Sequence, residues 1–323
     1  MLGFFVRRAI GALVLVWVVA SCAFLLAAVA PGDGTGGPFG MSPAERAALR
    51  AEMGLDRPIL VQYARWAGRA LRGDLGTSFR YRAPVGPMVL DRAANTALLA
   101  VVAMALALVL GLPAALLCAS RPRGPAARLV RAASLLLLSV PPFVGALALV
   151  LLAARTGWLP AGGMTSGDRT GLGWLVDLAW HVPVPALALA LPLAAMFERQ
   201  QAAALAESLA LPAVQAARAR GLPAARVLFR HAWRLSLKPV AALGGLALAA
   251  LLGGAFVVEM IAAWPGLGRL TYDAMLARDL PMVAGCAVAG SAVLSAGLLL
   301  SDLAVAAADP RALDGIVNRP DRD

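Results

Sequence analysis

Residues 93–120 read AANTALLAVVAMALALVLGLPAALLCAS, a stretch of 28 residues without a formal charge. A helix needs about 20 apolar residues to cross the hydrocarbon core of a bilayer, because each residue adds about 1.5 Å of length. The stretch exceeds that length. It therefore predicts a membrane-spanning helix.

Five further windows without formal charge have similar lengths, at residues 9–32, 132–154, 178–197, 239–258 and 280–301. The composition agrees, with 60% hydrophobic residues, 15% charged residues and a mean hydropathy of +0.77. The predicted fold class is all-α, a polytopic integral membrane protein with six transmembrane helices. A cleaved signal peptide is the alternative for the first window, because Ala28-Val29-Ala30 is typical of a cleavage site. The length of that window and the five later ones favour a retained helix.

The formal net charge of +11 raises the question of nucleic acid, but the arginines cluster at the ends of the apolar windows. That placement indicates membrane topology, with lipid as the partner and no nucleic acid. Basic residues fill the short segments 121–131 and 199–238, which predicts that both are cytoplasmic. Arg7 and Arg8 place the N-terminus on the same side, and an even number of spans returns the C-terminus there.

Residues 32–92 form the long connection that would lie outside, where acids accompany the arginines. Helices are expected at 43–53 and 58–71, the first supported by Ser42 as N-cap and Pro43 as first helical residue. The predicted organisation is a first transmembrane helix at 1–31, an extracytoplasmic domain at 32–92, and a five-helix core at 93–306. The core contains a cytoplasmic loop at 198–238, and a cytoplasmic tail follows at 307–323.

The sequence offers little chemistry of its own. The central parts of the windows are almost free of ionisable groups, which argues against an ion-coupled carrier. The chain has two histidines and three widely spaced cysteines, and it lacks HExxH, GxSxG and Walker A motifs. We expect no catalytic residues, no metal and no cofactor on this chain. His181 and Asp302 lie near window ends, where an interfacial placement is expected, and Ser291 has no histidine after it to act as base.

The basic segment 198–238 predicts a helix, a turn and a second helix. Good helix formers occupy 201–211 and 213–220, Gly221 is placed to end the helix, and a further helix is expected over 223–237. Pro212 and Pro223 each suit the first turn of a helix. Glycine at position 221 permits the sharp turn.

These residues carry a resemblance to a known family. Gln215-Ala216-Ala217-x-x-x-Gly221 resembles the EAA---G signature of ABC importer permeases, and Ala217-Arg218-Ala219-Arg220-Gly221-Leu222 is similar to its form in the dipeptide, oligopeptide and nickel permeases. The resemblance implies that Gln215, Ala216, Ala217, Arg218, Arg220 and Gly221 form a coupling helix that docks on an ATPase subunit. Further motifs of that family occur in the same order along the chain, among them GDLGTS at 73–78, SVPPF at 139–143, PGLG at 265–268 and RDLP at 278–281.

Three positions depart from the family pattern. Pro212-Ala213 stands where many relatives carry Asp-Tyr, Gln215 replaces the usual glutamate, and Leu235 replaces an asparagine. These changes leave the expected docking position of the loop in place and alter the polar side chains that it offers for contacts. Glu259 has two possible roles. In one interpretation it stabilises the turn before Pro265-Gly266, and in the other it faces the translocation pathway at an outer gate.

The resemblance implies a permease subunit in the bacterial inner membrane that hydrolyses no ATP itself. Its implied partners are a second homologous permease, two cytoplasmic ABC ATPase subunits and an extracytoplasmic solute-binding protein. The implied cargo is a peptide, with nickel or related small solutes as alternatives. The competing hypothesis is a non-transporting membrane scaffold or membrane enzyme that recruits a cytoplasmic partner through the basic loop.

Overall fold

The computed structural model describes residues 2–30, 43–167 and 170–308. In these ranges all regular elements are helices, and the β-type pairing consists of an isolated bridge between Thr77 and Pro84. The predicted all-α fold class is confirmed. Ser42, the expected N-cap, and residues 309–323 of the predicted tail lie outside the described residues.

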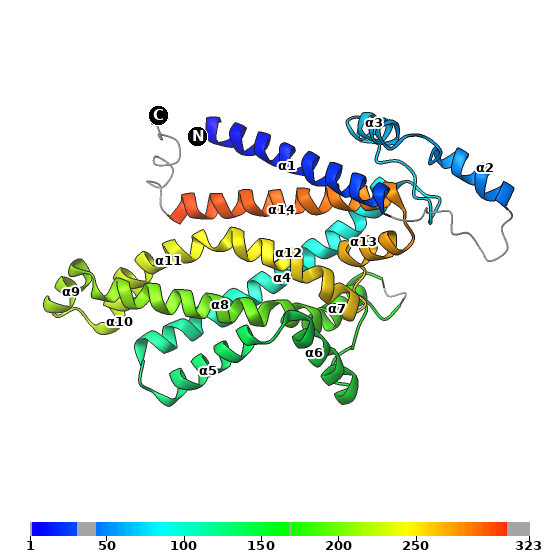
Figure 1. Cartoon of the computed structure of the whole chain (residues 1–323). Helices are drawn as coiled ribbons and strands as arrows, with labels where there is room; N and C mark the ends of the chain where they lie inside the picture. Colours follow the sequence, from blue (N-terminus) through cyan, green and yellow to red (C-terminus); the bar gives the residue numbers. More distant parts are fainter. Residues whose placement is uncertain (1, 31–42, 168–169, 309–323) are drawn as a thin grey trace.

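Long helices run side by side and make up the body of the molecule (Figure 1). Four are long and apolar enough to cross a membrane by themselves: α1 (Leu2–Val29), α4 (Val85–Ser120), α12 (Gly244–Ile261) and α14 (Leu280–Ala308). Two bent pairs raise the number to six if each pair is one span: α5 (Pro125–Ser139) with α6 (Pro142–Thr156), and α7 (Leu172–His181) with α8 (Pro183–Ala210). The described part thus agrees with a six-span membrane protein.

The third predicted span is not one uninterrupted helix. Helices α5 and α6 meet at 108°, with Val140 and Pro141 in extended conformations between them. Pro141 and Pro142 lack backbone N–H groups, and a proline disfavours the helical conformation of the residue before it. The charge-free window did not reveal this bend, because a search by charge and apolar length takes no account of the two prolines.

The fourth predicted span also differs in its limits. Helix α7 begins at Leu172, meets α8 at 46°, and α8 continues to Ala210. Residues 201–210, whose composition favours a helix, are helical as the continuation of α8. Proline at position 183 suits the first turn of α8, so the helix restarts there with a change of direction.

The connection between α1 and α4 contains α2 (Pro43–Met53) and α3 (Ile59–Ala70), which confirms both predicted helices. Helix α3 packs on α1 through a cluster of aromatic side chains: Trp17, Phe24, Tyr63 and Trp66. A further short helix, α13 (Leu267–Leu276), joins α12 to α14 at the same end of the bundle (Figure 1).

Small side chains allow the central helices to approach closely. Ala103, Ala107, Ala186 and Ala190 are fully buried where α4 packs against α8. A Cβ added to Gly111 would lie 2.6 Å from the Ala194 carbonyl oxygen, so the α4 and α8 backbones meet there. Helices in lipid gain their association from such van der Waals contact, because lipid tails offer no hydrophobic driving force.

Candidate functional site

The segment after α8 forms a helical excursion at one end of the bundle (Figure 1). Leu211 is extended, α9 (Pro212–Ala219) follows, and after a turn the chain continues through α10 (Ala224–Arg226), a π-helical segment η1 (Val227–Ala232) and α11 (Trp233–Ala242). The predicted helix, turn and helix are present. The second helix differs from expectation because it contains the π segment and runs to Ala242.

Gly221 makes the turn with a backbone φ of +77°. Its N–H donates to the Arg218 carbonyl at 2.9 Å, and the Leu222 N–H donates to the Ala217 carbonyl at 3.4 Å. These bonds use carbonyl groups that the end of α9 would otherwise leave unpaired. A side chain at position 221 would have space around it, so the backbone conformation, not crowding, requires glycine.

A small apolar cluster holds α9 against its neighbours. Val214 and Ala217 are buried against Leu205 of α8 and Val227 of η1, with Leu116 of α4 packed beside them. The opposite face of α9 is open. Of the six predicted coupling residues, Ala217 is buried in the cluster while the other five are exposed at the tip: Gln215, Ala216, Arg218, Arg220 and Gly221.

Gln215 makes a contact that the family's glutamate could not make. Its Nε2 donates to the Leu209 carbonyl at 2.7 Å, near the end of α8. A carboxylate accepts hydrogen bonds but cannot donate one to a carbonyl. Pro212 is the first residue of α9, where a missing N–H costs nothing. Two departures from the family pattern thus fit the local structure of this chain.

A buried hydrogen bond joins α8 to α11, the helices that precede and follow the α9 loop. Gln201 of α8 is fully buried, and its Nε2 donates to Ser236 Oγ of α11 at 2.8 Å. The Ser236 hydroxyl in turn donates to the Trp233 carbonyl. Sequence reasoning missed this pair because the residues lie 35 positions apart and neither belongs to a motif. The helices on either side of α9 are therefore linked by a polar contact as well as by packing.

Glu259 lies at the opposite end of the bundle, at the end of α12. Its side chain is fully buried, and Oε1 accepts a hydrogen bond from Thr96 Oγ1 at 2.6 Å. Oε2 accepts the N–H groups of Gly268 at 2.7 Å and Arg269 at 3.2 Å. The Thr96 hydroxyl also accepts the Leu267 N–H. The carboxylate therefore caps the N-terminus of α13, where unpaired N–H groups favour a negative charge.

The glycines of the PGLG motif at 265–268 are explained by this carboxylate. A Cβ at Gly266 would fall on the Glu259 carboxyl group, and one at Gly268 would lie 2.6 Å from the Phe256 Cα. Asn95 adds a further bond by donating to the Pro265 carbonyl at 2.9 Å. The structure thus places Glu259 within a turn-stabilising network at the end of α12. Figure 1 shows α13, which this network caps, at the opposite end of the bundle from α9.

Two other polar sites at this end were not foreseen from the sequence. The buried Asp279 accepts the Ser78 hydroxyl and, at 3.1 Å, the Arg80 N–H, while its Oδ1 accepts the Met282 N–H at the start of α14. The GDLGTS and RDLP motifs therefore meet in space. Both motifs were recognisable in the sequence, but the contact between them was not.

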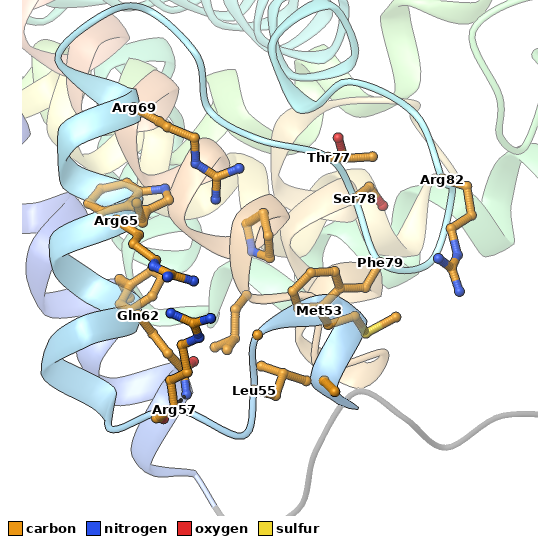
Figure 2. A pocket seen from close by; sticks show the side chains of 16 residues that line it. Met53, Leu55, Arg57, Gln62, Arg65, Arg69, Thr77, Ser78, Phe79 and Arg82 are labelled. Atoms are coloured by element: carbon orange, nitrogen blue, oxygen red, sulfur yellow. Dashed lines mark hydrogen bonds between the residues drawn. The ribbon is translucent and has the colours of Figure 1, made fainter. Parts of the chain in front are cut away.

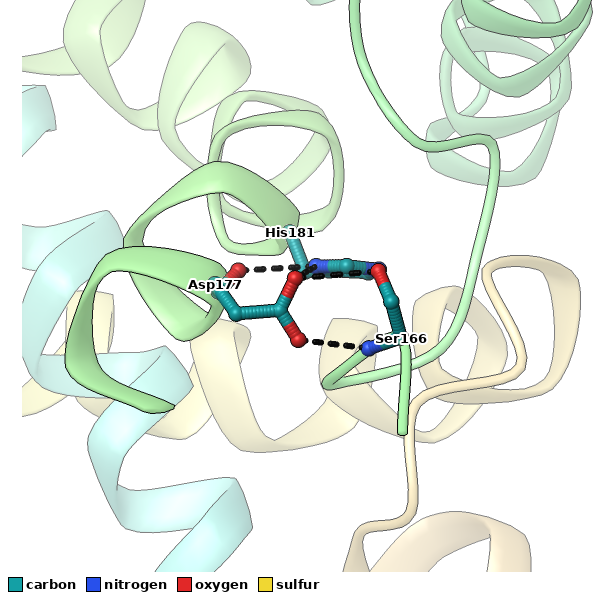
Figure 3. A network of polar contacts seen from close by, with 3 residues as sticks. All are labelled: Ser166, Asp177 and His181. Atoms are coloured by element: carbon teal, nitrogen blue, oxygen red, sulfur yellow. Dashed lines mark hydrogen bonds and ion pairs between the residues drawn. The ribbon is translucent and has the colours of Figure 1, made fainter. Parts of the chain in front are cut away.

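The second site joins Ser166, Asp177 and His181 at the α7–α8 bend (Figure 3). Ser166 donates to the Asp177 carboxylate through both N–H (2.6 Å) and hydroxyl (2.9 Å). His181 Nδ1 lies 2.8 Å from the Asp177 main-chain oxygen, and its Nε2 lies 3.4 Å from Ser166 Oγ. The serine proton points to aspartate, whereas a nucleophile needs a base to receive it. The site anchors the loop before α7, and His181 is buried within it.

Residues 111–314 match the family model described as the inner membrane component of binding-protein-dependent transport systems, and residues 1–100 match the model for its N-terminal region. The chain belongs to this permease family. It is 32% identical to the oligopeptide transport system permease protein AppB of Bacillus subtilis, over 96% of this chain and 99% of that protein. It is also 32% identical to the "Probable peptide ABC transporter permease protein y4tP" of Sinorhizobium fredii, over 95% and 98% of the two chains.

Membership in this family decides the class of protein. The chain is a multi-pass inner-membrane permease subunit of an ABC importer, and it acts within a complex that contains other subunits. It is a transporter subunit and not an enzyme. The family resemblance drawn from the loop at 215–221 is thereby confirmed, and no finding favours the scaffold or membrane-enzyme hypothesis.

Proposed function

We propose that this permease carries peptides into the cell. It would form the pathway with a second homologous permease, receive substrate from an extracytoplasmic solute-binding protein, and be driven by two cytoplasmic ABC ATPase subunits. The similarity to an oligopeptide permease over nearly the whole of both chains supports the substrate class. In this arrangement both chain termini and the Gly221 loop lie in the cytoplasm, as the arginine distribution predicts.

The exposed α9 with its Gly221 turn is the observation that carries the proposal. Small Ala216 permits close approach of an ATPase cleft, and the exposed Arg218 and Arg220 can pair with acidic groups on its rim. The α9 cluster around Val214 and the Gln201–Ser236 bond would then pass a displacement of α9 to α8 and α11. The loop acts as a mechanical link, and hydrolysis belongs to the ATPase subunits.

Glu259 has a supporting role in this proposal. By capping α13 it would hold the turn at the outer mouth of the pathway, so that α12, α13 and α4 move together. We propose that it contributes to an outer gate through this positioning, without contact between its carboxylate and the substrate.

Gly221→Pro tests the coupling role. Proline cannot adopt a φ of +77°, so the turn after α9 must break, while the buried spans are unaffected. We expect normal membrane insertion, loss of ATPase co-purification and loss of peptide uptake in a strain lacking the native gene. Gly157→Pro is the matched control, because Gly157 ends α6 with a φ of +66° and lies outside the loop. ATPase binding and uptake at normal levels in Gly221→Pro would refute the coupling assignment.

A further inference from the structure

A cavity of about 790 Å³ is lined by α2 and α3 (Figure 2), which lie at the end of the bundle opposite α9 (Figure 1). Helices α2 and α3 and the loop around Ser78 form its walls, and Phe24 of α1 and Pro281 of α14 close it on the side of the transmembrane helices. None of the residues proposed to couple the permease to its ATPase lines this cavity.

Four arginines line the cavity. Figure 2 shows Arg65 and Arg69 projecting from α3 into the cavity, Arg57 just before α3, and Arg82 on the loop across from them. Among the described residues that line the space, none is acidic. Several guanidinium groups around one space repel each other and attract an anion, and a guanidinium fork matches the oxygen atoms of a phosphate.

A buried indole adds a second, independent sign of a ligand. Trp66 lines the cavity with 2% of its surface exposed, and within the described part of the chain its Nε1 has no hydrogen-bond partner. A buried donor without an acceptor is destabilising, so an oxygen atom supplied by a ligand would remove that penalty. The donor and the arginines favour the same chemistry, an oxyanion.

The surroundings of the cavity indicate where such an anion comes from. Trp66 stacks on Phe24 and Trp17 of α1. Other apolar side chains of α1, such as Leu26 (73% exposed), contact little of the described chain. Helix α3 carries arginines on one side and exposes Leu60 on another. A basic amphipathic helix with neighbouring tryptophans is typical of the membrane interface, where phospholipid headgroups lie.

We propose that this cavity binds the phosphate headgroup of an anionic phospholipid from the leaflet at that end of the bundle. The arginines surround the phosphate, the Trp66 N–H donates to one of its oxygens, and the acyl chains lie along the apolar surface of α1. An acidic segment of a protein partner would satisfy the arginines, but it would leave the adjoining apolar surface of α1 and Leu60 unused.

Native mass spectrometry of the full chain tests the proposal, with phosphatidylglycerol as probe and phosphatidylcholine as zwitterionic comparison. Arg65→Gln/Arg69→Gln removes two charges that line the cavity and is expected to weaken phosphatidylglycerol binding about tenfold or more. The matched control Arg72→Gln/Arg128→Gln removes two charges outside the lining and should change binding less than about twofold. Trp66→Phe keeps the ring, loses the N–H and should weaken binding about fivefold.

The Arg65→Lys/Arg69→Lys variant guards against misfolding, because it keeps the charge and should recover most of the binding. Equal phosphatidylglycerol binding by the cavity and control variants would overturn the proposal. Displacement by inorganic phosphate at concentrations similar to the lipid would also overturn it, in favour of a free-phosphate site. If the Arg65→Gln/Arg69→Gln variant bound phosphatidylglycerol normally but, in the assembled transporter, lost ATP hydrolysis stimulated by the binding protein, the cavity would instead belong to a protein partner.

Discussion

Glu259→Ala is expected to loosen the N-terminus of α13 without unfolding the bundle. The substitution removes the acceptor for the Gly268 and Arg269 N–H groups and for the Thr96 hydroxyl. Hydrogen bonds to charged groups contribute about 1.5–3 kcal/mol each. The two backbone bonds would sum to about 3–6 kcal/mol, and the 3.2 Å length of the Arg269 bond favours the lower end.

Hydrogen–deuterium exchange measures this change directly. A loss of about 3 kcal/mol in local stability corresponds to a more than 100-fold faster exchange of the amides at the start of α13, because 1.36 kcal/mol is a factor of ten. Glu259→Gln keeps one carbonyl oxygen, so its amide exchange rate at the start of α13 should lie between those of the alanine variant and the native chain. The readout is local, so it does not depend on two-state unfolding of a membrane protein.

Glu207→Ala is the matched control, since Glu207 is exposed on α8 and its removal should leave α13 exchange unchanged. If Glu259→Ala exchanged at the native rate at residues 268 and 269, the capping role would be refuted. Uptake measured on the same variants would show whether the outer-gate proposal for Glu259 depends on an ordered α13.

Three further predictions follow from other parts of the chain. Asp279→Ala removes the acceptor that holds the Arg80 loop to α14, so trypsin should cleave at Arg80 at least about tenfold faster in limited proteolysis, and an unchanged rate would contradict the anchoring role. Gln215→Glu recreates the family signature but loses donation to the Leu209 carbonyl, which should lower local stability at the end of α8 by about 1 kcal/mol in hydrogen exchange. Ala225→Cys should react with a membrane-impermeant maleimide only from the cytoplasmic side, whereas labelling of intact cells would invert the proposed topology.

Much of the helix pattern follows from local sequence. The charge-free stretch at 93–120 is a helix because apolar residues of that length can satisfy their backbone hydrogen bonds in lipid only by helix formation. The turn at Gly221 and helices α2 and α3 were likewise predictable, since capping residues and helix formers act over a few positions. The bends at Val140 and Val182 were missed because the spans were defined by charge-free length, although prolines at 141, 142 and 183 mark both bends in the sequence.

The polar sites could be predicted only in part. Glu259, Gln215 and Gly221 stood out because they belong to motifs, but their partners did not. Thr96 lies 163 positions from Glu259 along the chain, and Ser78 lies 201 positions from Asp279. No local pattern encodes such distances, because the packing of separate helices decides which side chains meet.

The sequence by itself determined that this chain spans the membrane with helices, that a basic loop turns at Gly221, and that the motifs along it are those of a transport permease. Only the tertiary structure decided that the Glu259 carboxylate caps α13, that Gln201 joins α8 to α11, and that four arginines and a buried indole share one cavity. Hydropathy and helix capping act between neighbours in sequence, whereas a shared hydrogen bond or cavity requires the folded chain to bring distant residues together.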